Sequence, residues 1–207
     1  MSSPSRTPDQ AWHTLVEGNT RYAAGNSEHL HQDPARRAAL ADHQNPFALV
    51  LGCSDSRVPA EVVFDQGLGD LFVVRTAGHI VDSAVLGSLE FGVDVLGVPL
   101  VLVLGHTGCG AVAATMKAVD EHTTPAGYLR DVVERVSPAV FEARREPSAG
   151  AAEITAENVR QTATSLREKS SVLKHAVEDG RAALVGAVYR IDEGLVEPVY
   201  SAGAVEL

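Results

Sequence analysis

Four short, uninterrupted apolar runs alternate with segments of helical spacing, and this alternation narrows the choice of fold more than any other property of the chain. The runs lie at residues 47–52, 71–74, 100–104 and 182–189. Apolar runs of this length, bounded by proline, glycine or polar residues, are typical of strands that are buried on both faces. Strands that alternate with helices predict a parallel sheet covered by helices on both sides.

The helical segments carry recognisable capping signals. Residues 7–10 read Thr-Pro-Asp-Gln, a capping-box pattern with proline at the first helical position, and apolar residues follow at helical spacing until Gly25. A later helix is expected to begin after Asp82, whose carboxylate can accept hydrogen bonds from the first turn. The helical patterns beyond the first helix lie at residues 36–42, 83–96, 128–146 and 153–179.

The C-terminal tail predicts one more strand at an edge of the sheet. A turn signal at residues 192–194 separates the last apolar run from the segment 195–200, and Pro198 suits an edge because it cannot donate to a ladder. The expected fold is therefore α/β. It has a central, mostly parallel sheet of about four parallel strands plus a C-terminal antiparallel edge strand, flanked by helices, with an N-terminal helical arm.

Length and charge limit the classes of partner. The 207 residues, 45% of them hydrophobic, suit a single domain over residues 1–207 with residues 1–45 as the arm. The formal net charge of −10 would repel nucleic acids and anionic membranes. No apolar run approaches the roughly 18–20 residues that span a bilayer, and the first residues lack a signal-peptide pattern. We therefore expect a cytoplasmic protein without nucleic-acid or membrane partners.

The two cysteines of the chain both occur where an apolar run ends. Cys53 directly follows the first run, and Cys109 lies three residues after His106, which follows the third. Side chains at the carboxyl ends of neighbouring parallel strands converge. Two thiolates and one imidazole suit zinc, and three protein ligands leave a fourth tetrahedral position open for catalysis. A buried cysteine is also an ordinary core residue, so the pattern alone leaves packing and metal binding open.

An acid and a base follow Cys53 at a spacing that suits an ion pair. Asp55 and Arg57 lie two residues apart and can form a bidentate pair. A plain surface pair, worth under about 1 kcal/mol, is the alternative. Beside a metal ion, Asp55 could bind the ion, or Arg57 could hold Asp55 away so that it accepts a hydrogen bond from metal-bound water.

Together, the segments CSDSR at residues 53–57 and HTGCG at residues 106–110 resemble the paired signature of the β-class carbonic anhydrases. The segments FDQ at 64–66 and GDLFVVR at 69–75 are similar to that family as well, and the resemblance extends from about residue 12 to residue 189. It implies one Zn²⁺ per subunit and a zinc-bound hydroxide that attacks carbon dioxide, giving bicarbonate and a proton.

The resemblance also implies a role for individual residues. Gln44 matches an amide that binds bicarbonate, the Gly110 N–H could donate to the bound anion, and His79 is a candidate proton shuttle if exposed. Core packing is an equally good interpretation for the residues that match the apolar wall around carbon dioxide. The implied residues are Cys53, His106 and Cys109 for the metal, Asp55 and Arg57 for catalysis, and Gln44, Phe72, Ala77, Phe91 and Gly110 for the substrate.

Family members assemble as dimers, so we expect a homodimer or a dimer of dimers in which the N-terminal arm packs on a partner subunit. Val50 stands where some members have a tryptophan of a noncatalytic bicarbonate pocket, so that regulation is not expected here. Phe91 stands where tyrosine is frequent. Two alternatives remain, a zinc-dependent carbon disulfide or carbonyl sulfide hydrolase on the same fold, and a noncatalytic zinc or redox-responsive protein. The presence of both Asp55 and Arg57 favours catalysis.

Overall fold

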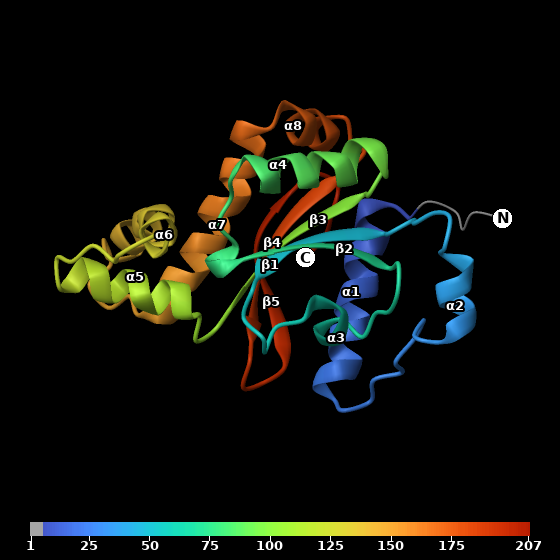
Figure 1. Ribbon diagram of the computed structural model, residues 1–207, viewed down its shortest axis with the longest axis horizontal. Helices are drawn as coiled ribbons and strands as arrows, with labels where there is room; N and C mark the ends of the chain where they lie inside the picture. The colour runs from blue at the N-terminus through green and yellow to red at the C-terminus, as the bar shows by residue number, and fades with distance from the viewer. Residues whose placement is uncertain (1–5) are drawn as a thin grey trace.

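A computed structural model describes residues 6–207, and its centre is a five-stranded sheet (Figure 1). The order across the sheet is β2-β1-β3-β4-β5, in which the first four strands run parallel and β5 is antiparallel to β4. This arrangement confirms the predicted α/β fold. The strands are β1 (Ala48–Cys53), β2 (Leu71–Thr76), β3 (Leu100–His106), β4 (Ala183–Arg190) and β5 (Leu195–Ala202).

Helices cover both faces of the sheet. One face packs against α1 (Pro8–Ala23) and the short α3 (Ala60–Val63), and α7 (Ala151–Lys169) lies across the other. The second face is completed by α4 (Ser83–Glu90) and α8 (Ser171–Glu178). The remaining helices are α2 (Pro34–Ala39), which buries no residue, and α5 (Gly110–Asp120) and α6 (Leu129–Ala143), which pack together beside α7 (Figure 1).

Burial explains why the central strands read as continuous apolar runs. Every residue of β1 and β3 is buried, and alternate side chains enter the two opposite core clusters. Each buried leucine or valine contributes about 1.5–3 kcal/mol relative to an exposed one. The strand β2 is different because it lies at an edge and most of its residues are only half-buried. The far edge is β5, where Pro198 occupies the predicted edge position next to a shift in register.

The N-terminal helix begins with the predicted capping box at Thr7. Its buried face, which includes Trp12 and Leu15, packs on the sheet of its own chain. Asn19 attaches the helix to the rest of the chain, because its side chain donates to the carbonyls of Val63 and Gly194 at 3.1 and 2.8 Å. The prediction that residues 1–45 pack on a partner subunit concerns an assembly and stays a prediction.

Two predicted helices differ from the structure. The helix expected over 83–96 ends at Glu90 and continues as a wider π-helical turn, η2 (Phe91–Val95). The helical pattern over 153–179 is broken at Ser170, which has extended backbone and caps α8. Three short elements were not anticipated, namely α3, α5 and the single turn η1 (Ala77–His79). Among the described residues, no helix is both long and apolar enough to cross a membrane.

Candidate metal centre

The candidate ligands lie at the point in the sheet where the strand order changes direction. From β1 the chain continues to β2 on one side and later to β3 on the other, so the carboxyl ends of β1 and β3 are neighbours at the kind of reversal where open α/β sheets form their sites. Cys53 ends β1, His106 ends β3, and Cys109 is the N-cap of α5. All three are buried, and their ligand atoms lie within 4.8 Å of one another. The predicted convergence is confirmed.

The imidazole of His106 is oriented for a metal. Its Nδ1 lies 2.9 Å from the Thr107 carbonyl oxygen, which can only accept, so Nδ1 carries the hydrogen and Nε2 carries a lone pair. This Nε2 is buried and has no hydrogen-bond partner among the described residues. Burial lowers the pKa of His106, but its contacts with Cys53 and the Thr107 carbonyl outweigh burial and raise it. A buried lone pair without a donor fits a bound cation.

The two thiols are electrostatically unequal. A hydrogen bond from Cys109 lowers the pKa of Cys53 to about 3, although burial opposes the shift. The same hydrogen bond, reinforced by burial, raises the pKa of Cys109. Neither cysteine forms a disulfide. A divalent cation would bind both sulfurs as thiolates and displace their protons.

Asp55 is held beside these ligands by Arg57. The guanidinium donates from Nε to Oδ1 at 2.9 Å and from Nη2 to Oδ2 at 2.7 Å, which is a bidentate pair. Nη2 also donates to the Gly108 carbonyl at 3.1 Å. The Arg57 hydrogen bonds hold the pKa of Asp55 well below its usual range. Oδ2 lies 3.9 Å from His106 Nε2, so a charged oxygen faces the ligand cluster without being one of its three members.

Arg75 fixes the turn that carries Cys53 and Asp55. Its Nε donates to the Cys53 carbonyl at 2.8 Å and its Nη2 donates to the Asp55 carbonyl at 2.6 Å. Sequence reasoning assigned this arginine no role. The sequence signal that could have indicated a role for Arg75 was a cation directly after the apolar residues of a predicted strand. In the structure Arg75 is in register with Gly52 on β1.

The predicted substrate residues fall into two groups. Ala77 directly follows Thr76, the residue paired with Cys53, and Gly110 directly follows Cys109, so both adjoin the ligands. Phe72 pairs with Leu49, four residues before Cys53, or about 13 Å away along the strand.

The second group, which consists of Gln44, Phe72 and Phe91, lies toward the end of the strands opposite to the metal ligands. Phe91 contacts Phe72 with the two rings tilted and their centroids 6.2 Å apart, and Gln44 is exposed in the segment that precedes β1. Within one chain these three side chains do not approach the metal ligands.

His79 does not have the exposure that a proton shuttle requires. Only 1% of its surface is exposed, and its Nε2 lies 3.0 Å from Asn158 Nδ2. Burial lowers the pKa of His79 to about 4. Because a shuttle needs contact with solvent and a pKa near the pH of the medium, the structure does not favour His79 as a proton shuttle.

Comparison with known proteins agrees with this geometry. A family model described as carbonic anhydrase matches residues 48–196. The β-carbonic anhydrase CafA of Aspergillus fumigatus is 27% identical in sequence, with a TM-score of 0.71 over 90% of this chain and 89% of that one. The chain belongs to the β-class carbonic anhydrase family.

Other members of this β-carbonic anhydrase family are also similar to the chain. "Carbonic anhydrase 2" of Mycobacterium tuberculosis is 50% identical over 191 residues, which are 92% of each protein. One of two tetrameric β-carbonic anhydrases from Sordaria macrospora has a TM-score of 0.75 over 95% of this chain and 100% of that one. Because that protein is only 23% identical, it supports the fold alone.

Proposed function

We propose that this chain catalyses the reversible hydration of carbon dioxide to bicarbonate and a proton, using one Zn²⁺ held by Cys53, His106 and Cys109. The observation that carries the proposal is the buried His106 Nε2, which has no hydrogen-bond partner within residues 6–207 and lies within 4.8 Å of the sulfurs of two thiols. This separation suits a single ion at about 2.3 Å from sulfur and about 2.0–2.1 Å from nitrogen.

The surrounding residues supply the geometry of the reaction. Zinc supplies a Lewis acid that makes water nucleophilic near neutral pH. Asp55 Oδ2 would accept a hydrogen bond from the attacking solvent molecule and orient it, while Arg57 keeps this carboxylate charged and holds both of its oxygens. Ala77 offers carbon dioxide an apolar surface beside the ligands. The Gly110 N–H, at the N-terminus of α5, donates to the bicarbonate anion.

A second copy of the chain would complete the pocket. The outer edge of β2 is unpaired among the described strands, and Phe91, which contacts Phe72 of β2, is 43% exposed, as is 65% of Val95 at the end of the same helical turn. If two β2 edges meet antiparallel across a two-fold axis, the start of one β2 lies beside the end of the other. Phe72, Phe91 and Gln44 of each copy would then approach the metal ligands of the other.

The unpaired β2 edge and the exposed Phe91 support our proposal of a homodimer or a dimer of dimers. We further propose that residues 1–207 form one domain and that residues 1–45 are an arm that contacts the other subunit. A cytoplasmic location agrees with two reduced cysteines at the site. Neither the family match nor the site geometry favours the carbon disulfide or carbonyl sulfide alternative.

Stopped-flow hydration of carbon dioxide, combined with zinc analysis of the same samples, tests the proposal. The unmodified chain should hold one zinc per subunit and catalyse hydration. Asp55→Asn should retain zinc and lose activity by about 100-fold or more, because an amide cannot orient the attacking solvent as a carboxylate does. The matched control is Asp179→Asn, which alters an exposed Asp–Arg pair of the same spacing. Stoichiometric zinc without hydration would instead support a structural metal.

A further inference from the structure

The turn η1 places a backbone donor on one of the proposed metal ligands. The Gly78 N–H donates to Cys53 Sγ at 3.3 Å. Gly78 has a φ of 64°, and a Cβ on it would lie 2.8 Å from the Cβ of Ala111. The next residue, His79, also has a positive φ, of 46°. A left-handed conformation is uncommon for histidine and persists only when surrounding contacts hold it.

Asn158 provides these contacts from the helix α7. Its side chain is almost completely buried, with 4% exposed. Nδ2 lies 3.4 Å from the Gly78 carbonyl oxygen and 3.0 Å from His79 Nε2. Because a carbonyl oxygen can only accept, the NH₂ group must be the part that faces the turn, and His79 Nε2 therefore accepts its second hydrogen. One amide thus bonds both left-handed residues.

We propose that Asn158 is a positioning residue for the metal centre, which holds the Gly78 N–H against the Cys53 sulfur. The proposal rests on the metal-binding role of Cys53 given above. A hydrogen bond from a backbone N–H fixes the direction in which the sulfur presents its lone pairs and withdraws charge from it. Without the Asn158 amide, the strained turn can relax and the N–H can rotate away from the sulfur. The site then loses part of its preorganisation for the ion.

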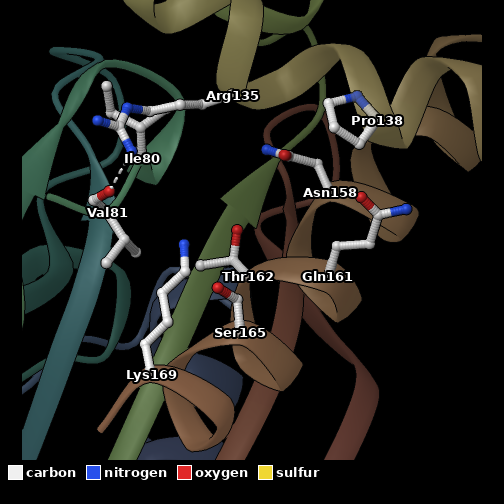
Figure 2. Close-up of a pocket in the computed structure, with 9 residues that line it drawn as sticks. All are labelled: Ile80, Val81, Arg135, Pro138, Asn158, Gln161, Thr162, Ser165 and Lys169. Atoms are coloured by element: carbon white, nitrogen blue, oxygen red, sulfur yellow. Dashed lines mark hydrogen bonds between the residues drawn. The ribbon is translucent and has the colours of Figure 1, made fainter.

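The surroundings of Asn158 allow this idea to be tested by substitution. Asn158 lines an open pocket of about 290 Å³ between α7, α6 and the segment after η1. Figure 2 shows it above Thr162, which lines the same pocket from the next turn of α7, with Ile80 and Val81 across from them. A side chain of similar size therefore fits at position 158. Thr162 has no hydrogen bond to η1 and is a matched control position.

The experiment compares two substitutions that remove the donor with two controls. Asn158→Leu keeps the branching but has no polar atom, and Asn158→Asp keeps the shape but presents an oxygen to the Gly78 carbonyl. Thr162→Val alters the same pocket. Ala163→Gly weakens α7 at a buried position that packs near Gly186 rather than η1. Each chain is loaded with Co²⁺, a spectroscopic substitute for zinc, in competition with a chelator.

Both Asn158 variants should bind Co²⁺ about 10-fold more weakly than the unmodified chain, since loss of a hydrogen-bonding group that orients a metal ligand costs about 10- to 100-fold in metal affinity. Their sulfur-to-cobalt charge-transfer band should move to lower energy, because a thiolate without its hydrogen bond donates more charge. The Gly78 amide hydrogen should exchange with solvent faster, also in the metal-free chain. Thr162→Val and Ala163→Gly should keep the affinity, the band and the exchange rate of the unmodified chain.

Several results would overturn the inference. One is unchanged affinity, band and Gly78 exchange in the Asn158 variants, and another is an equal loss in Ala163→Gly, which would reduce the effect to helix stability. If Asn158→Leu fails to fold, Asn158→Asp carries the same test. An unmodified chain that binds no Co²⁺ would overturn the proposed function and this inference together. Normal binding by the unmodified chain with unaffected variants would overturn the inference alone.

Discussion

The orientation of the Asp55 carboxylate decides whether Asp55 would itself bind an ion held by Cys53, His106 and Cys109, or would leave room on that ion for solvent. Its Oδ2 lies 3.9 Å from His106 Nε2, so a small rotation of the side chain would bring it to an ion held by the three ligands. Arg57 prevents that rotation because its planar guanidinium holds both carboxylate oxygens at once and is itself anchored on the Gly108 carbonyl. A lysine has one compact charge on a flexible stem and cannot hold both carboxylate oxygens in this bidentate geometry.

Arg57→Lys is therefore not a conservative change. Zinc should be retained, and the rate of carbon dioxide hydration should fall by about 10- to 100-fold, since Asp55 is released toward the metal. Zinc analysis and stopped-flow hydration measure the two quantities. Arg181→Lys is the matched control, because Arg181 pairs with Asp179 two residues away on the exposed surface at 3.7 Å. An Arg57→Lys chain with unchanged hydration would show that the bidentate pair has no catalytic role.

At the scale of elements, the connection after α1 is attached to the rest of the chain by a buried carboxylate. Asp65 accepts from the backbone N–H groups of Glu28 and His29 at 3.0 and 3.1 Å and from Arg21 Nε at 2.7 Å. Burial raises the pKa of Asp65, but these donors outweigh burial and lower it. A carboxyl group with a lowered pKa contributes stability that is complete above its unfolded pKa of about 3.9 and is lost as the pH falls through the folded pKa.

Asp65→Asn should lower the free energy of unfolding near neutral pH by about 1–3 kcal/mol, because buried donors lose a charged acceptor. The difference from the unmodified chain should begin to shrink below the unfolded pKa of about 4 and should be lost as the pH falls through the lowered native pKa. Urea unfolding near neutral pH and in acid measures the difference in the free energy of unfolding. Faster amide hydrogen exchange at Glu28 and His29 would show that the loss of stability arises at these two donors. The exposed Asp42 provides a control substitution. If the difference in the free energy of unfolding grew in acid, it would contradict a stabilising role for the charged Asp65 carboxylate.

The same scale separates what the sequence predicts from what it does not. The strands β1, β3 and β4 were predictable because burial on both faces requires unbroken apolar residues. The break between α7 and α8 was not, because a serine inside a helical pattern resembles an exposed helical residue. Ser170 is in fact buried, and its hydroxyl donates to Glu90 at 2.6 Å, a contact with a residue 80 positions away.

Ser170→Ala tests this interpretation of the break. The hydroxyl also accepts from the Leu173 N–H at 3.1 Å, so the substitution removes the N-cap of α8 and the partner of Glu90 together. The free energy of unfolding should fall by about 1–2 kcal/mol, as for loss of an N-cap. Urea unfolding measures the change, with the exposed neighbour substitution Ser171→Ala as control. Equal effects of the two substitutions would contradict the capping role.

At the scale of the whole molecule, the site residues that come together within one chain were predictable from strand ends, whereas those that need a second copy were not. Cys53, His106 and Cys109 could be predicted because each adjoins a recognisable strand whose direction fixes where it ends. Gln44 and Phe72 carry no such signal, because in one chain they lie at the other end of the strands from the metal ligands. Their proposed contact with substrate depends on a second copy, and no local sequence pattern reveals which surfaces of the two copies meet.

Val95→Glu tests the proposed interface at the β2 edge, since 65% of this apolar side chain is exposed next to Phe91. Light scattering of the unmodified chain at micromolar concentration should give at least twice the monomer mass, whereas the variant should shift toward the monomer because a charge would be buried. Its hydration rate should fall while zinc is retained. Phe141→Glu, at a 61% exposed residue on α6, is the control. A monomeric unmodified chain would contradict the two-subunit pocket.

The coordination of the zinc-loaded chain is the property on which the proposed function and the role of its metal centre depend. X-ray absorption at the zinc edge should show two sulfur neighbours at about 2.3 Å and two nitrogen or oxygen neighbours at about 2.0–2.2 Å. Substituting either Cys53 or Cys109 with serine should remove one sulfur. A shell without sulfur, or one that keeps both sulfurs after either substitution, would contradict a catalytic ion on Cys53, His106 and Cys109.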